Sequence, residues 1–307
     1  MDRGQADPVP RPPYDVVVVG SANLDVVLDV RAVPRPGETV LARGRTTGPG
    51  GKGANQAVAA ARSGARTAFV GAVGDDDAAA VLLDALGDAG VGTSAALLSP
   101  QTATGTAYVV VDEAGENAIV VDPGANATLT GLGDAQRDLV AAAAVVLCQL
   151  EVPLGAVREA LAAAGGLRVL NAAPAQPLPD DVAALLDVLV VNAQEARDVA
   201  GAASLDEAVP LLLARVPEVV VTLGPDGALV ARRGEDPVAV PGVPARRVAD
   251  TTGAGDAFTG AYAAARAAGA DALDAARTGC AAGSLAVERA GAATAPTRDE
   301  VRERLQA

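Results

Sequence analysis

The sequence predicts an α/β protein with three layers, in which a mainly parallel central sheet has helices on both of its faces. Short runs rich in Val and Leu alternate with Ala- and Leu-rich stretches for most of the 307 residues. The runs are nearly continuous in apolar residues, as is typical of parallel strands buried on both faces. The repeated strand-then-helix order favours crossover connections that return each strand to the same sheet.

The elements can be followed in order along the chain. Those expected in the first part are a strand, a helix, a strand and a helix, at Asp15–Val19, Ala54–Arg62, Thr67–Val73 and Asp77–Leu86. Further buried strands are expected at Val145–Leu150, Leu167–Asn171, Val188–Asn192 and Val219–Leu223. The last part is expected to be helical, at Ala254–Ala268, Ala272–Arg289 and from Thr297 onward. The last helix opens with Thr297-x-x-Glu300, which is a capping box.

Two segments interrupt this order. Val26–Thr47 carries apolar residues without helical spacing and contains two prolines, and Thr106–Asp122 has the pattern of a hairpin with its turn at residues 112–115. We expect segments at about 26–47 and 104–122 to form a small β-sheet that projects from a domain spanning residues 14–307. The alternative is that they are edge strands of the main sheet. The polar, proline-rich residues 1–13 are expected to be a disordered leader.

The composition excludes several classes of function. The chain has no histidine, which rules out a Ser-His-Asp hydrolase, a His-paired cysteine enzyme and a His-rich metal site. Aromatic residues are only 2% and the net charge is −14, so nucleic acid is not an expected partner. No apolar run reaches the roughly 18 residues of a membrane helix, so no membrane partner is expected. Cys148 and Cys280 lie far apart in sequence, which favours reduced thiols and a cytoplasmic location.

A glycine-rich turn leads into the helix expected at residue 254. Residues 250–258 read DTTGAGDAF. Glycines let a ligand approach the backbone amides, and the unpaired N–H groups of a helix start favour an anion. Asp256 falls in the first helical turn, where it is either a general base or simply a favourable first-turn acid. An anion site beside a carboxylate base suits phosphoryl transfer to a hydroxyl group.

A second glycine-rich stretch, GPGGKGANQ at residues 48–56, contains the pattern G-x-G-x-x-G. A dinucleotide site would need a buried strand before it and an acid about 20 residues after it. Arg43–Thr47 is instead polar and broken, and Lys52 precedes Gly53 rather than Ser or Thr, which excludes a Walker A loop. The stretch is interpreted as a loop that presents Lys52 and Asn55 to a polyol or sugar.

Polar residues also follow several strands. Asn23 and Asp25 come after the first strand, at the sheet edge where ligands of open α/β sheets bind. An amide and a carboxylate suit neighbouring hydroxyl groups, although each alone is common in turns. Glu151 lies at the same edge. The stretches at 192–195 and 222–227 either line a ligand crevice or are a helix start and a hairpin turn.

Several of these motifs resemble the PfkB family of carbohydrate kinases. Residues 50–56 (GGKGANQ) and 250–256 (DTTGAGD) resemble its two signatures, the first in the form typical of the ribokinase branch. Five shorter motifs fall in the same order as in that branch, namely GSANLD at 20–25, GANA at 124–127, QLE at 149–151, N-x-x-E at 192–195 and TLG at 222–224. The resemblance runs from about Tyr14 to the last helix. One departure is Asn171-Ala-Ala-Pro174 in place of the common Asn-Pro-Ala-Pro.

The resemblance implies a ribokinase-like fold and the transfer of the γ-phosphate of ATP to the O5 hydroxyl of D-ribose. The projecting sheet would be a lid over the sugar and the interface of a homodimer. Asp256 would be the general base, and the amides of Gly253, Ala254 and Gly255 the anion hole. The sugar would be held by Asn23, Asp25, Gly51, Lys52, Gly53, Asn55 and Glu151.

The resemblance also implies a nucleotide site and two metal ions. The nucleotide side would be lined by Asn192, Thr222, Gly224, Gly227 and Gly255. Glu195 would act through water on the Mg²⁺ carried by ATP. An activating K⁺ would lie against Asp250, Thr252, Ala286, Arg289, Gly291 and Thr294.

Other functions remain open at this point. The machinery would be unchanged in a kinase of the same family that acts on deoxyribose, fructose or a nucleoside. A different class is an NAD-dependent oxidoreductase, and a third is a protein that senses a sugar without catalysis. An intact Asp256 argues against the third.

Overall fold

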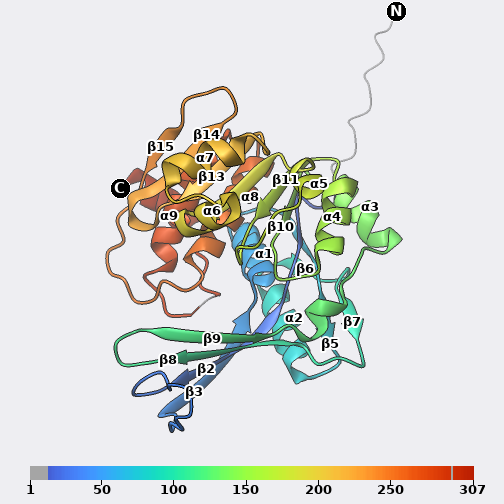
Figure 1. The fold of residues 1–307 in the computed structure, drawn as a ribbon. Helices are drawn as coiled ribbons and strands as arrows, with labels where there is room; N and C mark the ends of the chain where they lie inside the picture. Colours follow the sequence, from blue (N-terminus) through green and yellow to red (C-terminus); the bar gives the residue numbers. More distant parts are fainter. Residues whose placement is uncertain (1–12, 292) are drawn as a thin grey trace, which may run out of the picture.

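A central sheet organises the molecule (Figure 1). The computed structural model describes residues 13–291 and 293–307, so residues 1–12 of the expected leader lie outside the described residues. Within the described part, the sheet has nine strands in the order β15-β14-β13-β12-β11-β10-β1-β4-β6. Neighbouring strands from β6 to β13 pair in parallel, and β14 and β15 add an antiparallel edge. Their bounds are β1 Val16–Val19, β4 Thr67–Val70, β6 Val91–Gly92, β10 Val145–Cys148, β11 Leu167–Asn171, β12 Val188–Asn192, β13 Glu218–Thr222, β14 Gly227–Arg232 and β15 Val238–Pro241.

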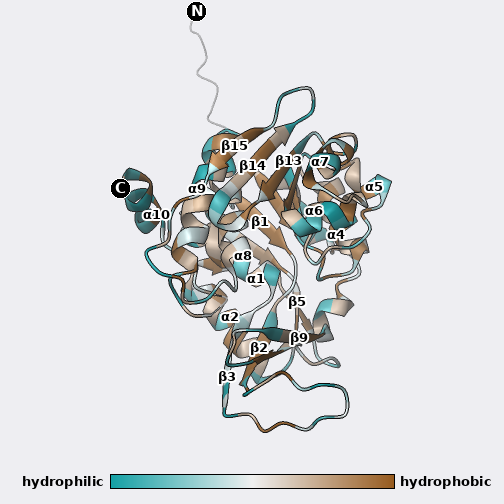
Figure 2. Cartoon of the chain, turned by 60° about the vertical axis from the view of Figure 1, so that its left-hand side comes forward, coloured by the Kyte–Doolittle hydropathy of each residue, from teal (hydrophilic) through white to brown (hydrophobic). Residues whose placement is uncertain are grey.

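Helices cover both faces of this sheet. One face packs against α3 (Asp134–Ala142), α4 (Leu154–Ala163), α5 (Asp180–Ala183), α6 (Ala193–Ala200) and α7 (Leu205–Leu213). The other packs against α1 (Lys52–Arg62), α2 (Asp77–Asp88), α8 (Ala254–Ala267) and α9 (Ala272–Ala286), with α10 (Arg298–Gln306) outside α9. In β1, Val17 and Val19 belong to the first core and Val16 and Val18 to the second, because side chains alternate along a strand. The apolar strands between the two helix layers are visible in Figure 2.

Helices α1 and α8 cross closely on one face of the sheet. A Cβ at Gly260 of α8 would lie 2.5 Å from the Cβ of Ala59 and from the carbonyl oxygen of Gln56. Glycine and alanine at the crossing therefore let the two backbones approach. This contact brings the polar start of α1 next to the start of α8.

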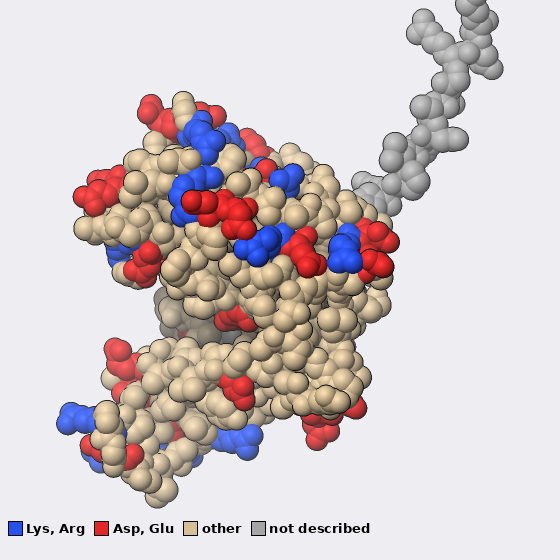
Figure 3. Space-filling view, turned by 45° about the vertical axis from the view of Figure 1, so that its right-hand side comes forward, with Lys and Arg blue, Asp and Glu red and all other residues tan. Residues whose placement is uncertain are grey.

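A second sheet projects from the main body, as expected, and is separate from the nine-stranded sheet. Its strand order is β3-β2-β8-β9, with bounds β2 Asn23–Asp29, β3 Gly44–Gly50, β8 Gly105–Val111 and β9 Asn117–Asp122. We call this sheet the lid. Strands β8 and β9 form the expected hairpin, whose turn is held by Asp112 Oδ1 accepting from the N–H groups of Ala114 and Glu116. Figure 3 shows the hollow that separates the lid from the main body.

The lid strands extend beyond the expected segments. β2 begins at Asn23, not near residue 26, and β3 ends at Gly50, not near 47. Arg43–Thr47 is polar, as interpreted, but the expectation that it is broken was wrong, because residues 44–47 are strand. They pair with β2 while their side chains stay exposed, so the strand has no apolar pattern to reveal it.

The main domain also differs from expectation in details. The strand expected at Thr67–Val73 is two strands, β4 and β5 (Ala72–Gly74), separated at Gly71, and β5 pairs with β7 (Leu97–Ser99) instead of the main sheet. A side chain at Gly71 would meet the Phe69 ring and the Gly20 carbonyl oxygen. The helix expected to reach Arg289 ends at Ala286. The capping box at Thr297 and Glu300 is confirmed. No helix among the described residues is long and apolar enough to cross a membrane.

Candidate active site

Asp256 lies in the first turn of α8, where the glycine-rich stretch becomes helix. Gly253 is the N-cap and has a left-handed backbone with φ of 76°, a conformation that glycine adopts without strain. Gly253, Gly255 and Asp256 line a cavity of about 140 Å³. The N–H of Ala254, expected in the anion hole, donates to the Thr251 carbonyl oxygen at 3.3 Å. The turn therefore places a carboxylate beside the positive end of a 14-residue helix.

The carboxylate of Asp256 is buried and held at both oxygens. Only 8% of the residue is exposed. Asn55 Nδ2 donates to Oδ2 at 3.1 Å, and Gln56 Nε2 donates to Oδ1 at 2.8 Å. Burial raises the pKa of Asp256 above its usual range, although Lys52 and the two amide donors oppose the rise. A raised pKa suits a group that must accept a proton during a reaction.

Glu151 ties the loop before α1 to the end of the first strand. Its Oε2 accepts from Ser21 Oγ at 2.5 Å and from the Lys52 N–H at 2.9 Å. A Cβ at Gly53 would lie within 2.5–2.6 Å of the backbone of residues 20 and 21, so only glycine allows this approach. The structure therefore brings the predicted residues of both strand exits together.

Lys52 lines the same cavity as Asp256. Burial of the ammonium would lower the pKa of Lys52, but the nearby carboxylates of Asp256 and Glu151 outweigh it and the net pKa is raised. Lys52 is therefore positively charged at neutral pH. It supplies a cation where the carboxylates gather.

Asp25 faces the same group of charges from the lid. It lies in β2, which pairs with β3, and a Cβ at Gly50 of β3 would lie 2.2 Å from the Asp25 carboxylate. Burial, followed by repulsion from Glu151 and Asp256, raises the pKa of Asp25 to about 6. Asn23 begins β2 and its Oδ1 accepts from Asn126 Nδ2 at 2.7 Å. Asn23 and Asp25, which were predicted to hold the sugar, thus belong to the lid and not to a turn.

The predicted nucleotide residues divide into two groups. Asn192, Glu195 and Thr222 line the cavity of Asp256. Asn192 caps α6, and Glu195 Oε2 accepts from its N–H at 2.8 Å, so the expected helix start is present. Burial raises the pKa of Glu195. Gly224 lies instead two residues beyond Thr222, in the turn after β13, and Gly227 is the first residue of β14.

The six residues expected around a potassium ion come together. Asp250 accepts from the N–H groups of Thr252 at 2.8 Å and Gly291 at 2.9 Å. Thr294 Oγ1 donates to the carbonyl oxygens of Gly291 at 3.1 Å and Ala286 at 3.4 Å. Arg289 Nη1 donates to the Thr294 carbonyl oxygen at 3.4 Å. Burial alone would raise the pKa of Asp250, but its two backbone donors outweigh burial and the pKa is lowered. The Asp250 carboxylate, the Thr294 hydroxyl and the carbonyl oxygens of Ala286 and Gly291 are the kind of ligand that a hard cation prefers.

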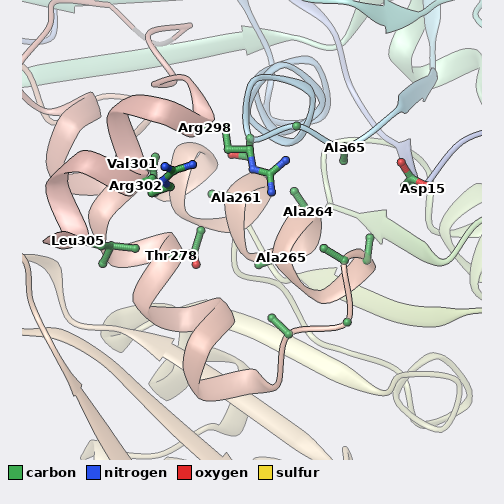
Figure 4. Close-up of a pocket in the computed structure, with 16 residues that line it drawn as sticks. Asp15, Ala65, Ala261, Ala264, Ala265, Thr278, Arg298, Val301, Arg302 and Leu305 are labelled. Atoms are coloured by element: carbon green, nitrogen blue, oxygen red, sulfur yellow. The ribbon is translucent and has the colours of Figure 1, made fainter.

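Two larger cavities each have a volume of about 780 Å³. One is a cleft between the lid and the loop after residue 247, lined among others by Asp25, Asp250, Thr252 and Thr294. The other lies near the start of β1, between the ends of α1 and α8 and helix α10 (Figure 4). Many of its lining residues are alanines, and it holds none of the predicted site residues. Size alone does not identify the site, whereas the grouping of polar residues at strand ends does.

Several polar residues at the site belong to the sequence motifs but had no predicted role of their own. Gln56, Gln149 and Asn171 are buried beside Asp256, and Asn126 bonds to the backbone of Ala22 and to Asn23. Gln56 could have been found, since it lies four residues after Lys52 and shares its helix face. Gln149 and Asn171 had a weaker signal, a polar residue at the end of an apolar strand.

Comparisons with known proteins bear on this arrangement. The profile of the pfkB family of carbohydrate kinases matches residues 14–299. The ribokinase of Haemophilus influenzae is 36% identical over 302 residues, which cover 95% of this chain and 98% of the relative. A bifunctional ribokinase/ribose-5-phosphate isomerase A from Fructilactobacillus sanfranciscensis is 38% identical over 259 residues, and the match spans 81% of this chain but only about half (48%) of that relative.

The fold gives the same answer as the sequence matches. The structure of Arabidopsis thaliana ribokinase in complex with ribose and ATP superimposes with a TM-score of 0.90 at 33% identity, covering 96% of this chain and 99% of the other. The family profile covers nearly the whole domain, including the glycine-rich turn, Asp256 and the lid. The chain therefore belongs to the pfkB family of carbohydrate kinases.

Proposed function

We propose that this chain is a ribokinase, which transfers the γ-phosphate of ATP to the O5 hydroxyl of D-ribose. One observation carries the proposal: Asp256, in the first turn of α8, shares a cavity with Lys52, Asn192, Glu195 and Thr222. A carboxylate at a helix start, next to residues from two strand exits, suits a hydroxyl on one side and a phosphate chain on the other.

In this proposal Asp256 accepts the hydroxyl proton as the oxygen attacks the γ-phosphorus. Its raised pKa favours proton acceptance, and a positioned general base contributes about 10²–10⁴-fold to a rate. The amides of Gly253, Ala254 and Gly255 receive the charge that develops on the phosphate oxygens. The Ala254 N–H leaves the Thr251 carbonyl oxygen to do so. Lys52 adds a positive charge against the −14 net charge of the chain.

The sugar lies between the lid and the main body. Asp25 and Asn23 approach it from β2, while Gly51, Lys52, Gly53 and Asn55 approach it from the start of α1. Glu151 holds the loop of Lys52 in place through the backbone N–H. Few aromatic side chains are available to stack a base, which favours a small sugar over a nucleoside.

The nucleotide lies along Asn192, Thr222, Gly224, Gly227 and Gly255, and Mg²⁺ arrives with it. The cavity fits an ion that comes with the nucleotide and keeps its waters, because Glu195 lines it and offers a carboxylate to such a water. Magnesium neutralises charge on the phosphates of the nucleotide. Glu195 has one oxygen bonded to Asn192, which leaves the carboxylate able to accept from a water of the ion.

Potassium and a homodimer complete the proposal. Asp250, Gly291, Ala286 and Thr294 supply oxygen atoms for K⁺, with Thr252 and Arg289 holding the loop. A second copy of the chain covers the lid, where all six residues of β9 are exposed. A cytoplasmic location is supported by the two buried, free thiols of Cys148 and Cys280.

A substrate panel tests the proposed function. ADP release is followed with ribose, deoxyribose, fructose and adenosine in parallel, and the product of the best substrate is identified by ³¹P NMR. We expect the highest kcat/KM with ribose and a phosphate at O5. A higher kcat/KM with deoxyribose or fructose would assign the chain to another sugar, and NAD binding without ADP release would overturn the kinase.

A further inference from the structure

A row of three buried amide side chains leads away from Asp256. Asn171 also lines the Asp256 cavity, whereas Gln56 and Gln149 do not. Gln56 and Gln149 have no exposed surface, and Asn171 is 8% exposed. Gln149 Nε2 donates to Gln56 Oε1 at 2.6 Å. Gln56 Nε2 donates both to Asn171 Oδ1 and to Asp256 Oδ1, each at 2.8 Å. Gln56 belongs to α1, Asn171 ends β11, and Gln149 directly follows β10.

The direction of these hydrogen bonds is fixed from one end. Asn171 Nδ2 donates to the Val190 carbonyl oxygen at 3.1 Å, and a carbonyl can only accept. Asn171 therefore turns its Oδ1 toward Gln56, and Gln56 must present its NH₂ group. Both hydrogens of that group are then used, one on Asn171 and one on Asp256. Gln149 Nε2 donates to Oε1 of Gln56, so every polar atom of the Gln56 side chain has a partner.

We infer that Gln56, held by Gln149 and Asn171, is a positioning residue that fixes Oδ1 of Asp256, so that Oδ2 is the oxygen that takes the proton. This inference rests on the proposed kinase function. Gln56 does not line the cavity of Asp256, so it acts through the carboxylate and not on the substrate. Oδ2 is bonded to Asn55, which is itself a proposed sugar contact.

The packing around Gln149 supports a dedicated role. Its Oε1 is buried and has no hydrogen-bond partner among the described residues. A buried unpaired oxygen lowers stability, and an apolar residue that only filled the space would avoid this cost. A Cβ at Gly20 would lie 1.9 Å from that oxygen. Glycine directly after β1 thus leaves room for the Gln149 amide to reach Gln56.

Substitution by methionine tests the row, because methionine keeps the length and removes the donors. Gln56→Met is expected to lower kcat by about 10–100-fold, as a small misplacement of a reacting group does, with KM for the sugar within about threefold of wild type. Loss of a donor to the carboxylate disfavours its ionised form, so the acidic limb of the kcat–pH profile moves to higher pH. Lys52, Glu151, Asp25 and Glu195 also act on Asp256 and are unchanged in every variant.

Gln149→Met and a double variant separate positioning from simple damage. Gln149→Met is expected to shift the same limb by less, and the double variant should match Gln56→Met instead of multiplying the two losses. The matched control is Gln136→Met, since Gln136 is also buried, donating to the Ala95 carbonyl oxygen far from Asp256. It should lower the melting temperature and leave kcat and the pH profile unchanged.

Each outcome decides the inference. A Gln149→Met enzyme with unchanged kcat and unchanged acidic limb overturns it, whether or not Gln56→Met folds. Equal pH profiles for Gln136→Met and Gln56→Met would overturn it as well. The pKa of Asp256 is measured separately by ¹³C NMR of the carboxyl carbon in the substrate-free protein, with the signal assigned by its loss in Asp256→Asn. The inference requires this pKa to rise in Gln56→Met, whether or not the wild type phosphorylates a sugar. A wild type that phosphorylates no sugar would reject the proposed function instead.

Discussion

The two sheets of this protein differ in how they hold their functional residues. In the main sheet the four residues of β1 are completely buried, and Asp256 is fixed above the strand ends by two amide donors. In the lid the six residues of β9 are exposed, and Asp25 lies at the inner end of a sheet that is open to solvent. The carboxylate beside the main sheet lies in α8 and is fixed within the core by α1, whereas the lid brings its own carboxylate to the rim of a cleft.

This difference suits two different tasks. A general base must keep its geometry when substrates come and go, and burial among satisfied donors provides that. A lid must let the sugar enter, so fewer of its residues can be committed to a core. We therefore expect changes in the main domain to act on kcat, and changes in the lid to act on KM and on assembly.

The largest effect is expected from Asp256→Asn. Removing the base should lower kcat by about 10²–10⁴-fold while ribose binding, measured by calorimetry, stays within a few fold. Asp274→Asn is the matched control, because Asp274 is also a first-turn acid, at the start of α9. It should change kcat by less than about twofold. A variant of Asp256 that kept a tenth of the wild-type kcat would show that this carboxylate is not the base.

The success of the sequence predictions follows the same division. The boundaries of strands β10 to β13 were predicted to within two residues, because buried runs rich in Val are a clear sequence pattern. The boundaries of β3 were not, because its first four residues, GRTT, are exposed and are held in the strand by pairing with β2. The amide row was missed because Gln56 is 93 residues from Gln149 and 115 from Asn171, so only the fold brings them together. The sequence therefore indicated the glycine-rich turn and its carboxylate, but not the amides that hold this carboxylate.

The next effect is expected from Asp25→Asn in the lid. Loss of a charged acceptor for a sugar hydroxyl should raise KM for ribose by about 10–100-fold with little change in kcat. In the wild type KM should rise as the pH falls through about 6, where the Asp25 carboxylate becomes protonated. The control is Asp29→Asn at the outer end of β2, where the side chain is exposed and pairs with Arg43. An unchanged KM for Asp25→Asn would remove the lid carboxylate from the sugar site.

The same variant should make the free protein more stable. Because the pKa of Asp25 is raised from 3.8 to about 6, the folded state binds more protons than the unfolded state between these values. Stability from this group is therefore present below pH 3.8 and is lost as the pH rises through about 6. Asp25→Asn should raise the melting temperature at pH 8 and not at pH 3.5. A lower melting temperature at pH 8 would contradict this sign.

A smaller effect on catalysis, but a clear one on assembly, is expected from Val120→Asp in β9. Val120 is 68% exposed between Ile119 and Val121, which are also exposed, so a charge there costs nothing in a monomer. In a dimer through the lid it buries two carboxylates, and light scattering should show a shift from dimer to monomer. Val81→Asp on α2, outside the lid, is the control. A monomeric wild type would reject the dimer without touching the site.

The smallest effect is expected from exchanging K⁺ for Na⁺ at equal ionic strength. Asp250 belongs to the loop that leads into α8, while Ala286 ends α9 and Gly291 and Thr294 lie between α9 and α10. A cation bound to their oxygen atoms would therefore hold the loop of the anion hole against the end of α9 without touching the substrate. We expect a severalfold higher kcat in K⁺, and Asp250→Asn should lose this difference. Because the pKa of Asp250 is lowered, this carboxylate stays charged and the stimulation by K⁺ should persist at pH 6. At the same pH the Asp25 carboxylate becomes protonated, so KM for ribose should already be rising. Equal rates in both salts would leave the loop positioned by its own hydrogen bonds, and the fixed geometry of the main domain would then need no ion.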